Sequence, residues 1–327
     1  MIRLIFGLLL STVLAIVGGI FCIPLLKKIK AGQTILHYVK THENKNGTPT
    51  MGGLFFIASS SLVFVLLGGY KSKVALVSLS IGLAYLIVGF LDDFIKIKYK
   101  KNQGLKAYQK IIFQLGVAIV AGVYAYKSGM TIFYLPFINA QVNLGFFTIP
   151  TIIIIFLAIT NSVNLTDGLD GLAGQVSAVY LIFIIVLTIL QCENFNVLYL
   201  SVEEYENLQL LSACLIGAIL GFLTFNVNKA SVFMGDTGSL SLGGFIGAIS
   251  IFTLNSFFIP IIGIMFVMSS ISVIIQVLYF KKTRKRVFLM APLHHHFQLK
   301  GYSETKISYI YVLITIFFGL ISLLSYL

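Results

Sequence analysis

Long apolar runs separated by short polar segments cover almost all of the 327-residue chain. Each run is close to the roughly 20 apolar residues that a helix needs to cross the hydrocarbon core of a bilayer. Charged residues, glycine and proline mark the ends of the runs, so the pattern predicts ten membrane-spanning helices. Their predicted ranges are 4–26, 52–69, 74–91, 109–127, 149–165, 172–191, 208–225, 240–256, 257–279 and 306–327. The boundary between the eighth and ninth rests on Asn255, Ser256 and Pro260.

One segment between the predicted helices has a different pattern. Residues 130–147 place β-forming residues on both sides of Asn139 and Ala140, which predicts a small hairpin. The composition agrees with a membrane protein, because 58% of residues are hydrophobic and 10% are charged, whereas soluble domains carry about 25% charged residues. We therefore predict an all-α polytopic membrane protein of about ten transmembrane helices with a small external β-hairpin. Residues 1–327 are expected to form a single integral membrane domain, because the helices leave room only for loops.

Basic residues are concentrated in the connections on one side of the predicted bundle. Among the 23 Lys and Arg residues, the exceptions are Arg3, Lys71, Lys73 and Lys127. Because basic residues collect on the cytoplasmic face of a membrane, the connections on the basic side should be cytoplasmic and both termini external. The cytoplasmic connections are then 27–51, 92–108, 166–171, 226–239 and 280–305.

All the aspartates lie on this basic side, each near the end of a predicted helix. They are Asp92, Asp93, Asp167, Asp170 and Asp236. An aspartate at the centre of a membrane helix costs about 2.5–3.5 kcal/mol, so acids close to the membrane are candidates for function. The simpler alternative is that each acid is solvated at the interface or paired with a lysine. Because all of them gather on one side among many basic residues, we favour an active site on the cytoplasmic connections.

The first two acidic motifs each carry a pair of aspartates. In IVGFLDDFIK, Asp93 and Lys96 can meet on one helix face, which suits phosphate and metal binding but also an ordinary ion pair. In NSVNLTDGLDGLAG, glycines beside Asp167 and Asp170 favour an opened helix end, although an aspartate there could simply cap the next helix. Two asparagines inside the preceding helix favour a site, since a loop alone needs no amides there.

Three further segments carry polar groups that suit an anionic ligand. In FMGDTGSLSLGG, Asp236 lies between glycines that permit close approach of a ligand, and Ser239 can cap the helix that follows. In PLHHHFQ, the three histidines could suggest zinc; on a helix their side chains diverge by about 100° each, so donors to a phosphate or uracil group fit better. In HENKNGTPTMGG, Lys45 is the best-placed cation for an anionic substrate, although the loop could serve only as a topology signal.

Five of these motifs together resemble those of a known enzyme family. The chain carries TPTMGG at 48–53, DDFIK at 92–96, NLTDGLDGLA at 164–173, FMGDTGSLSLGG at 233–244 and PLHHHFQ at 292–298. In these motifs and their order it is similar to the phospho-N-acetylmuramoyl-pentapeptide transferases. The histidine triplet is the most specific motif, because it separates this family from its sister GlcNAc-1-phosphate transferases.

The resemblance implies an enzyme of peptidoglycan biosynthesis in the bacterial cytoplasmic (inner) membrane, with its active site facing the cytoplasm. It implies ten helices, external termini, a homodimer and dependence on Mg²⁺. The substrates would be UDP-N-acetylmuramoyl-pentapeptide and the membrane lipid undecaprenyl phosphate, and the products lipid I and UMP. A hard cation held by carboxylates would offset the repulsion between the two anionic substrates. No nucleic-acid partner is expected.

By the same resemblance, catalysis and metal binding fall to Asp92, Asp93 and Asp236, with Asp236 the magnesium ligand and the other two at the phosphates. Substrate binding is expected at a larger set of positions. These are Lys45, Lys96, Asn164, Asp167, Asp170, Asn226, Ser239, Gln276, His294 and His295. The resemblance assigns no role to the remaining lysines near the second cytoplasmic connection, including Lys110.

Three alternatives stay open at the level of sequence. A UDP-GlcNAc:polyprenyl-phosphate GlcNAc-1-phosphate transferase would share the aspartates, and the histidine triplet argues against it. A divalent-cation or anion transporter would place ionisable residues at mid-depth in several helices, whereas the predicted helix interiors hold almost none. The lipid phosphate could attack directly or through a covalent phospho-aspartate; we favour direct attack because a phosphate oxygen is already anionic.

Overall fold

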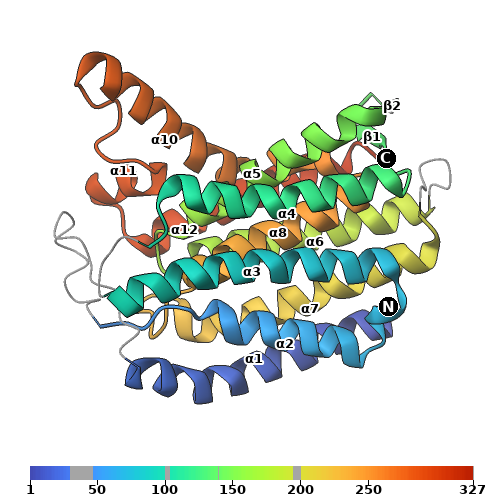
Figure 1. Cartoon of the computed structure of the whole chain (residues 1–327). Helices are drawn as coiled ribbons and strands as arrows, with labels where there is room; N and C mark the ends of the chain where they lie inside the picture. Colours follow the sequence, from blue (N-terminus) through green and yellow to red (C-terminus); the bar gives the residue numbers. More distant parts are fainter. Residues whose placement is uncertain (30–46, 100–103, 139, 194–199, 327) are drawn as a thin grey trace.

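The computed structural model describes residues 1–29, 47–99, 104–138, 140–193 and 200–326. Within these ranges the chain is a bundle of helices (Figure 1). The helices are α1 (Ile2–Lys28), α2 (Gly53–Leu66), α3 (Lys73–Tyr99), α4 (Ala107–Lys127), α5 (Thr148–Thr166), α6 (Leu172–Glu193), α7 (Val202–Asn226), α8 (Gly235–Phe252), α9 (Ile259–Ile262), α10 (Ile264–Thr283), α11 (Leu293–Leu299) and α12 (Glu304–Leu323). Short 3₁₀ turns occur at η2 (Gly69–Lys71), η3 (Gly145–Phe147) and η5 (Ser256–Phe258).

Eight of the described helices are long and apolar enough to cross a membrane. They are α1, α3, α4, α5 with the preceding η3, α6, α7, α10 and α12, while α2 is a shorter apolar helix. The predicted class, an all-α polytopic membrane protein, is therefore confirmed. Both chain termini and the hairpin lie at one end of the bundle, and α11 lies at the other (Figure 1).

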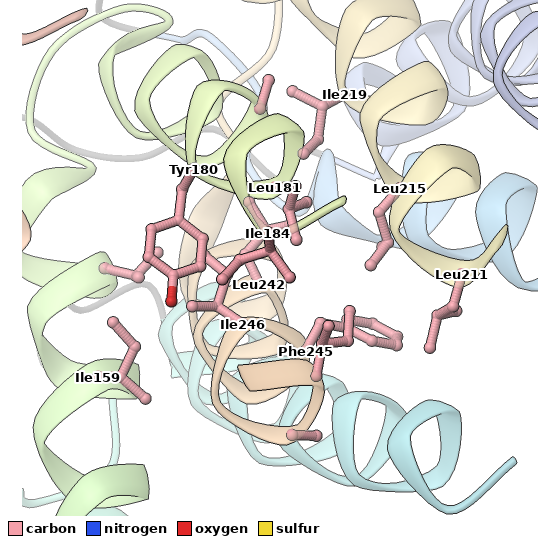
Figure 2. Packing of buried hydrophobic residues seen from close by; sticks show 14 of the residues in the cluster. Ile159, Tyr180, Leu181, Ile184, Leu211, Leu215, Ile219, Leu242, Phe245 and Ile246 are labelled. Atoms are coloured by element: carbon pink, nitrogen blue, oxygen red, sulfur yellow. The ribbon is translucent and has the colours of Figure 1, made fainter. Parts of the chain in front are cut away.

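Helix α8 lies at the centre of the bundle, where it packs against α3, α5 and α2. Side chains of α6, α7 and α8 interdigitate in the core beside Ile159 of α5 (Figure 2). The labelled members are Tyr180, Leu181, Ile184, Leu211, Leu215, Ile219, Leu242, Phe245 and Ile246. Because lipid tails are as apolar as these side chains, close van der Waals packing rather than burial from water holds such helices together. The packed core fixes where the end of α8 meets the ends of its neighbours.

Two helix boundaries differ from the sequence prediction in a way that matters for the site. Helix α3 continues to Tyr99 instead of ending at 91, so Asp92, Asp93 and Lys96 lie inside its last turns. Helix α8 begins at Gly235 instead of 240, which places Asp236 in its first turn. The charges on α3 and α8 are paired with one another across the helices, so they do not end the helices as isolated charges would.

The predicted helix 257–279 is interrupted. Residues 256–258 form η5, α9 follows as a single turn, and Gly263 separates α9 from α10. Pro260 lies in the first turn of α9, where its missing N–H leaves no intrahelical hydrogen bond unmade. The sequence pattern predicts the boundary between the eighth and ninth helices near the correct residues, but it does not predict the break at Gly263.

The predicted hairpin is confirmed within 130–147. Strands β1 (Ile132–Leu135) and β2 (Ala140–Asn143) pair antiparallel, with Ile132 opposite Asn143 and Leu135 opposite Ala140. The Tyr134 hydroxyl donates to the Ser325 carbonyl over 3.0 Å, which ties the hairpin to the C-terminal segment.

Candidate active site

Three carboxylates from two helices converge at the end of the bundle that carries α11. Asp92 and Asp93 come from the last turns of α3, and Asp236 from the first turn of α8. One oxygen of each lies within 4.8 Å of the others, and no other such group of three His, Cys, Asp or Glu side chains occurs in the part of the chain that the structure describes. Asp92 and Asp93 are 3% and 1% exposed, so these acids are held inside the protein. The convergence expected from the separate motifs is therefore observed.

Backbone and hydroxyl donors hold the two carboxylates of α3 in place. Asp93 Oδ2 accepts hydrogen bonds from the Thr237 N–H over 2.9 Å and from the Thr237 hydroxyl over 2.7 Å. Asp92 Oδ1 accepts from the Leu105 N–H over 2.8 Å. Asp93 therefore joins α3 to the start of α8, and Asp92 joins α3 to the segment that leads into α4.

Two lysines neutralise most of the acidic charge. Lys96 Nζ lies 2.6 Å from Asp92 Oδ2, 2.7 Å from Asp236 Oδ2 and 3.4 Å from Asp93 Oδ1. Lys110 Nζ lies 3.0 Å from Asp236 Oδ2. Counted as ionised groups, three carboxylates and two ammonium groups leave one formal negative charge, which favours a bound cation.

Lys110 is the residue of this cluster that sequence reasoning missed. It lies in the first turn of α4, and its Nζ also donates to Asn164 Oδ1 over 3.4 Å. The local pattern shows Lys110 only as one of several lysines at a helix end. A signal was nevertheless present, because the next turn of the same helix face carries a glutamine, Gln114, where a lipid-facing helix would carry an apolar residue.

Asn164 connects α5 to the carboxylate cluster. Its Nδ2 donates to Asp236 Oδ1 over 2.5 Å and to Ser239 Oγ over 2.8 Å. The Ser239 hydroxyl in turn donates to the Gly235 carbonyl over 3.0 Å. Ser239 is thus inside α8 and does not cap it; the cap position is Met234, which makes no side-chain cap bond. The expectation of a Ser239 cap was wrong because α8 begins one turn earlier than predicted.

Asp170 and Asn226 lie in a second polar region, where α6 begins and α7 ends. Asp170 Oδ2 accepts from the Ala230 N–H over 3.1 Å, and Asn226 Oδ1 accepts from the Gly171 N–H over 3.0 Å. These bonds join the start of α6 to the loop after α7. A cavity of about 190 Å³ lies next to them. Its lining includes Asp170, Gln175, Asn228, Glu304 and Tyr309.

Asp167 lies between α5 and α6, outside the two sets of hydrogen bonds described for the carboxylate cluster and for Asp170 with Asn226. Burial, and after it the charges of Asp236, Asp93 and Asp170, raise the pKa of Asp167 well above its usual range. The Asp167 carboxyl therefore keeps its proton to a higher pH than an exposed carboxyl, which suits a hydrogen-bond donor. Asp167 is the C-terminal cap residue of α5 and does not cap α6.

The histidine triplet lies on α11, a short helix that the apolar pattern did not predict. His294 is fully buried against Gly168 and His295, and neither of its ring nitrogens has a hydrogen-bond partner among the residues that the structure describes. Burial, followed by the neighbouring His295, lowers the pKa of His294 well below its usual range, so this ring stays neutral. His295 Nδ1 lies 3.1 Å from Gln298 Oε1, and His296 Nδ1 accepts from the Leu289 N–H over 3.1 Å. His295 and His296 thus bind different partners, in agreement with the divergence of these side chains on a helix.

Gln276 near the end of α10 binds the loop that leads to α11. Its Oε1 accepts from the Val287 N–H over 3.0 Å and from the Phe288 N–H over 2.9 Å, and its Nε2 donates to the Phe288 carbonyl over 3.2 Å. Gln276 therefore positions the loop before the histidine triplet. Lys45, expected in substrate binding, lies outside the described residues.

Comparison with known proteins identifies the class and then the family of this chain. Residues 74–254, which include the three carboxylates and both lysines, match the family model of glycosyl transferase family 4. Residues 45–57 match signature 1 of phospho-N-acetylmuramoyl-pentapeptide-transferase. The site thus lies on a membrane-embedded member of the glycosyl transferase family 4 class.

Relatives of this name match over nearly the full length of the chain. The phospho-N-acetylmuramoyl-pentapeptide-transferase of Clostridium novyi (strain NT) is 41% identical over 98% of this chain and 96% of its own length. That of Clostridioides difficile (strain 630) is 42% identical over the same shares. That of Clostridium perfringens (strain 13 / Type A) is 41% identical over 99% of this chain and 98% of its own. The chain belongs to the phospho-N-acetylmuramoyl-pentapeptide-transferase family.

Proposed function

We propose that this chain transfers phospho-N-acetylmuramoyl-pentapeptide from UDP-N-acetylmuramoyl-pentapeptide to undecaprenyl phosphate, giving lipid I and UMP in peptidoglycan biosynthesis. Family membership supports the reaction. The observation that carries it is the cluster of Asp92, Asp93 and Asp236 with two lysines, at the ends of membrane-crossing helices. A lipid phosphate at the membrane surface and a water-soluble nucleotide can meet only at such a boundary.

The residues of the cluster fit a magnesium ion. Carboxylate oxygens are the ligands that this hard cation prefers, and the three acids can each offer one oxygen. Asp92, Asp93 and Asp236 would hold the ion together. Asp93 would use Oδ1, because its Oδ2 already accepts hydrogen bonds from Thr237. Lys96 contacts the same three carboxylates, so its ammonium and a divalent cation would compete for these oxygens. When bound, Mg²⁺ would act as a Lewis acid that neutralises phosphate charge.

Lys96 and Lys110 supply the positive charge that lets two phosphates approach. An oxygen of undecaprenyl phosphate forms a bond to the sugar-linked phosphorus, the bond from that phosphorus to the bridging oxygen breaks, and UMP leaves with the electron pair. We propose direct attack, because Asp92 and Asp93 are buried and their oxygens are engaged by Leu105, Thr237 and Lys96. A nucleophilic aspartate would need a free oxygen facing the substrate.

Substrate recognition is proposed for the polar groups around the cluster. Asn164 and Ser239 orient Asp236, and we assign the nucleotide to the side of the cavity beside Asp170 and Asn226. The raised pKa of Asp167 favours its protonated form, which can donate a hydrogen bond. His294 and His295 of α11 would lie beside the same ligand, and Gln276 positions the loop that leads to that helix. Lys45, from the predicted connection 27–51, would contribute a cation.

We further propose that the protein lies in the bacterial cytoplasmic membrane as a homodimer of single-domain chains, with this site facing the cytoplasm. Two observations support the orientation. The chain termini lie at the opposite end of the bundle from α11 (Figure 1). Most basic residues belong to connections at the α11 end, which is the distribution of a cytoplasmic face.

The direct test is a transfer assay on purified protein in detergent, with UDP-N-acetylmuramoyl-pentapeptide radiolabelled in its sugar-linked phosphate. We expect UMP release that requires both Mg²⁺ and undecaprenyl phosphate, with all label in the lipid product and none on the protein. Label retained on the protein after one turnover would contradict direct attack. Faster UMP release from UDP-GlcNAc would favour the sister class, and solute flux in proteoliposomes without UMP formation would favour a transporter.

A further inference from the structure

A pair of polar side chains lies inside the bundle, one helical turn from Lys110 and Asn164, the partners of Asp236. Gln114 of α4 and Asn161 of α5 bind each other in both directions: Asn161 Nδ2 donates to Gln114 Oε1 over 2.7 Å, and Gln114 Nε2 donates to Asn161 Oδ1 over 3.3 Å. Gln114 is fully buried. Asn161 Nδ2 also donates to the Leu157 carbonyl over 2.8 Å, so the pair is firmly held.

This amide pair shares its helix faces with the two partners of Asp236. Lys110 precedes Gln114 by four residues on α4, and Asn164 follows Asn161 by three residues on α5. Side chains at these spacings lie on the same face of a helix, one turn apart. Any rotation or slip of α4 against α5 would therefore break the amide pair and move Lys110 away from Asn164 and Asp236 together.

A third helix is tied to the same point. The Tyr85 hydroxyl of α3 donates to the main-chain carbonyl of Gln114 over 3.2 Å. The Tyr85 ring stacks on Phe156 of α5, with ring centroids 5.7 Å apart. Tyr85 lies two turns before Asp92 on α3. The helices that supply Lys110, Asn164 and Asp92 thus meet at one polar contact beneath the site.

Simple adhesion between α4 and α5 does not require buried amides. Farther along the same face, α4 carries the buried small residues Ala118, Ala121 and Ala125, and such residues let membrane helices pack closely. Polar groups inside a membrane bundle are costly, and their best-attested structural use is to select one register between helices. A reciprocal amide pair can form in one register and is lost in its neighbours.

We propose that Gln114 and Asn161 are positioning residues, which set the register of α4 against α5 so that Lys110 and Asn164 meet Asp236. The proposal rests on the proposed function for its effect on turnover. Its effect on Lys110 can be measured without any transferase activity, so failure of one claim is distinguishable from failure of the other.

The test compares three variants of the full-length protein in detergent. Gln114→Leu removes the amide at similar side-chain length. The double exchange of Gln114→Asn with Asn161→Gln keeps both amides and their combined length, so it should restore the pair. Gln191→Leu breaks a second buried Gln–Asn contact, Asn255 Nδ2 to Gln191 Oε1 over 3.0 Å, which lies near the other end of the bundle.

The first readout is the rate at which a water-soluble acylating reagent modifies Lys110, measured by mass spectrometry against Lys127, an exposed lysine at the far end of α4. Gln114→Leu should raise the Lys110 rate by at least about threefold, the size expected for loss of an ion pair. The double exchange and Gln191→Leu should leave it unchanged. An unchanged Lys110 rate in Gln114→Leu would overturn the proposal.

The second readout separates kcat from KM. Gln114→Leu should lower kcat by roughly ten- to a hundredfold with KM for the nucleotide substrate within about twofold, because misplaced groups act on the reacting phosphates. The double exchange should recover most of kcat. Gln191→Leu should lower the melting temperature while kcat stays within about twofold of the unaltered protein. If Gln114→Leu behaves like Gln191→Leu, the pair is structural only and the proposal fails.

Discussion

Replacing Asp236 by Asn should lower turnover by roughly a thousandfold, the scale on which loss of one preorganised charged group acts in an active site. The Asn side chain has nearly the same size, but Lys96 and Lys110 both lose the carboxylate that they share. A neutral amide is also a much weaker ligand for a hard cation than a carboxylate. The measurement is the initial rate of UMP release with both substrates and saturating Mg²⁺.

Folding of the Asp236→Asn protein is checked by its melting temperature and by its elution in gel filtration. The matched control is Glu203→Gln, which makes the same chemical change on an exposed acid in the first turn of α7. Its rate should stay within about twofold, because surface substitutions rarely have larger effects. A rate like that of the unaltered protein in folded Asp236→Asn would remove Asp236 from the reaction.

Replacing Gly89 by Ala should both destabilise the protein and lower its turnover by about a hundredfold, because misplacement by about 1 Å has effects of that size. A Cβ atom at Gly89 would lie 2.1 Å from the Asp236 carbonyl oxygen and 2.7 Å from Thr237 Cα. Both are backbone atoms that cannot rotate away, so α3 and α8 must separate. Asp92 and Asp93 follow Gly89 within one turn and would move away from Asp236 with α3.

Overpacking of this kind costs about 1–3 kcal/mol of the free energy of unfolding, so a lower melting temperature should accompany the lower rate. The control is Gly116→Ala on α4, where a new Cβ would meet no atom within 4 Å. Alanine is favoured over glycine inside a helix by about 1 kcal/mol, so this control should retain its rate and its stability. A Gly89→Ala protein with normal rate and melting temperature would show that close contact of α3 and α8 is not required.

The class of this protein could be predicted because apolarity along a chain is a local property. Runs of about 20 apolar residues identify membrane helices without knowledge of their neighbours, and the hairpin could be recognised from its β-forming residues. The same locality explains the errors at helix ends. The predicted helix stops at residue 91, before the first charge, whereas α3 continues because Lys96 balances the charge of Asp92 and Asp93.

The candidate site could be predicted as a set of motifs but not as an arrangement. The motif aspartates do meet, while Lys110 and Gln114 were missed because their partners, Asp236 and Asn161, are distant in sequence. Ser239 was expected to be a helix cap but lies one turn inside α8. The spacing of Lys110 and Gln114 indicates a polar face on this helix, but only the packed structure shows which distant residues that face contacts.

The most direct measurement for the central claim is anomalous diffraction from crystals of the protein grown with Mn²⁺, at a concentration that supports UMP release in place of Mg²⁺. The account predicts one anomalous peak among the carboxylates of Asp92, Asp93 and Asp236, and its loss in Asp236→Asn. A peak bound elsewhere, or none at these carboxylates, would contradict the proposal that they hold the catalytic cation.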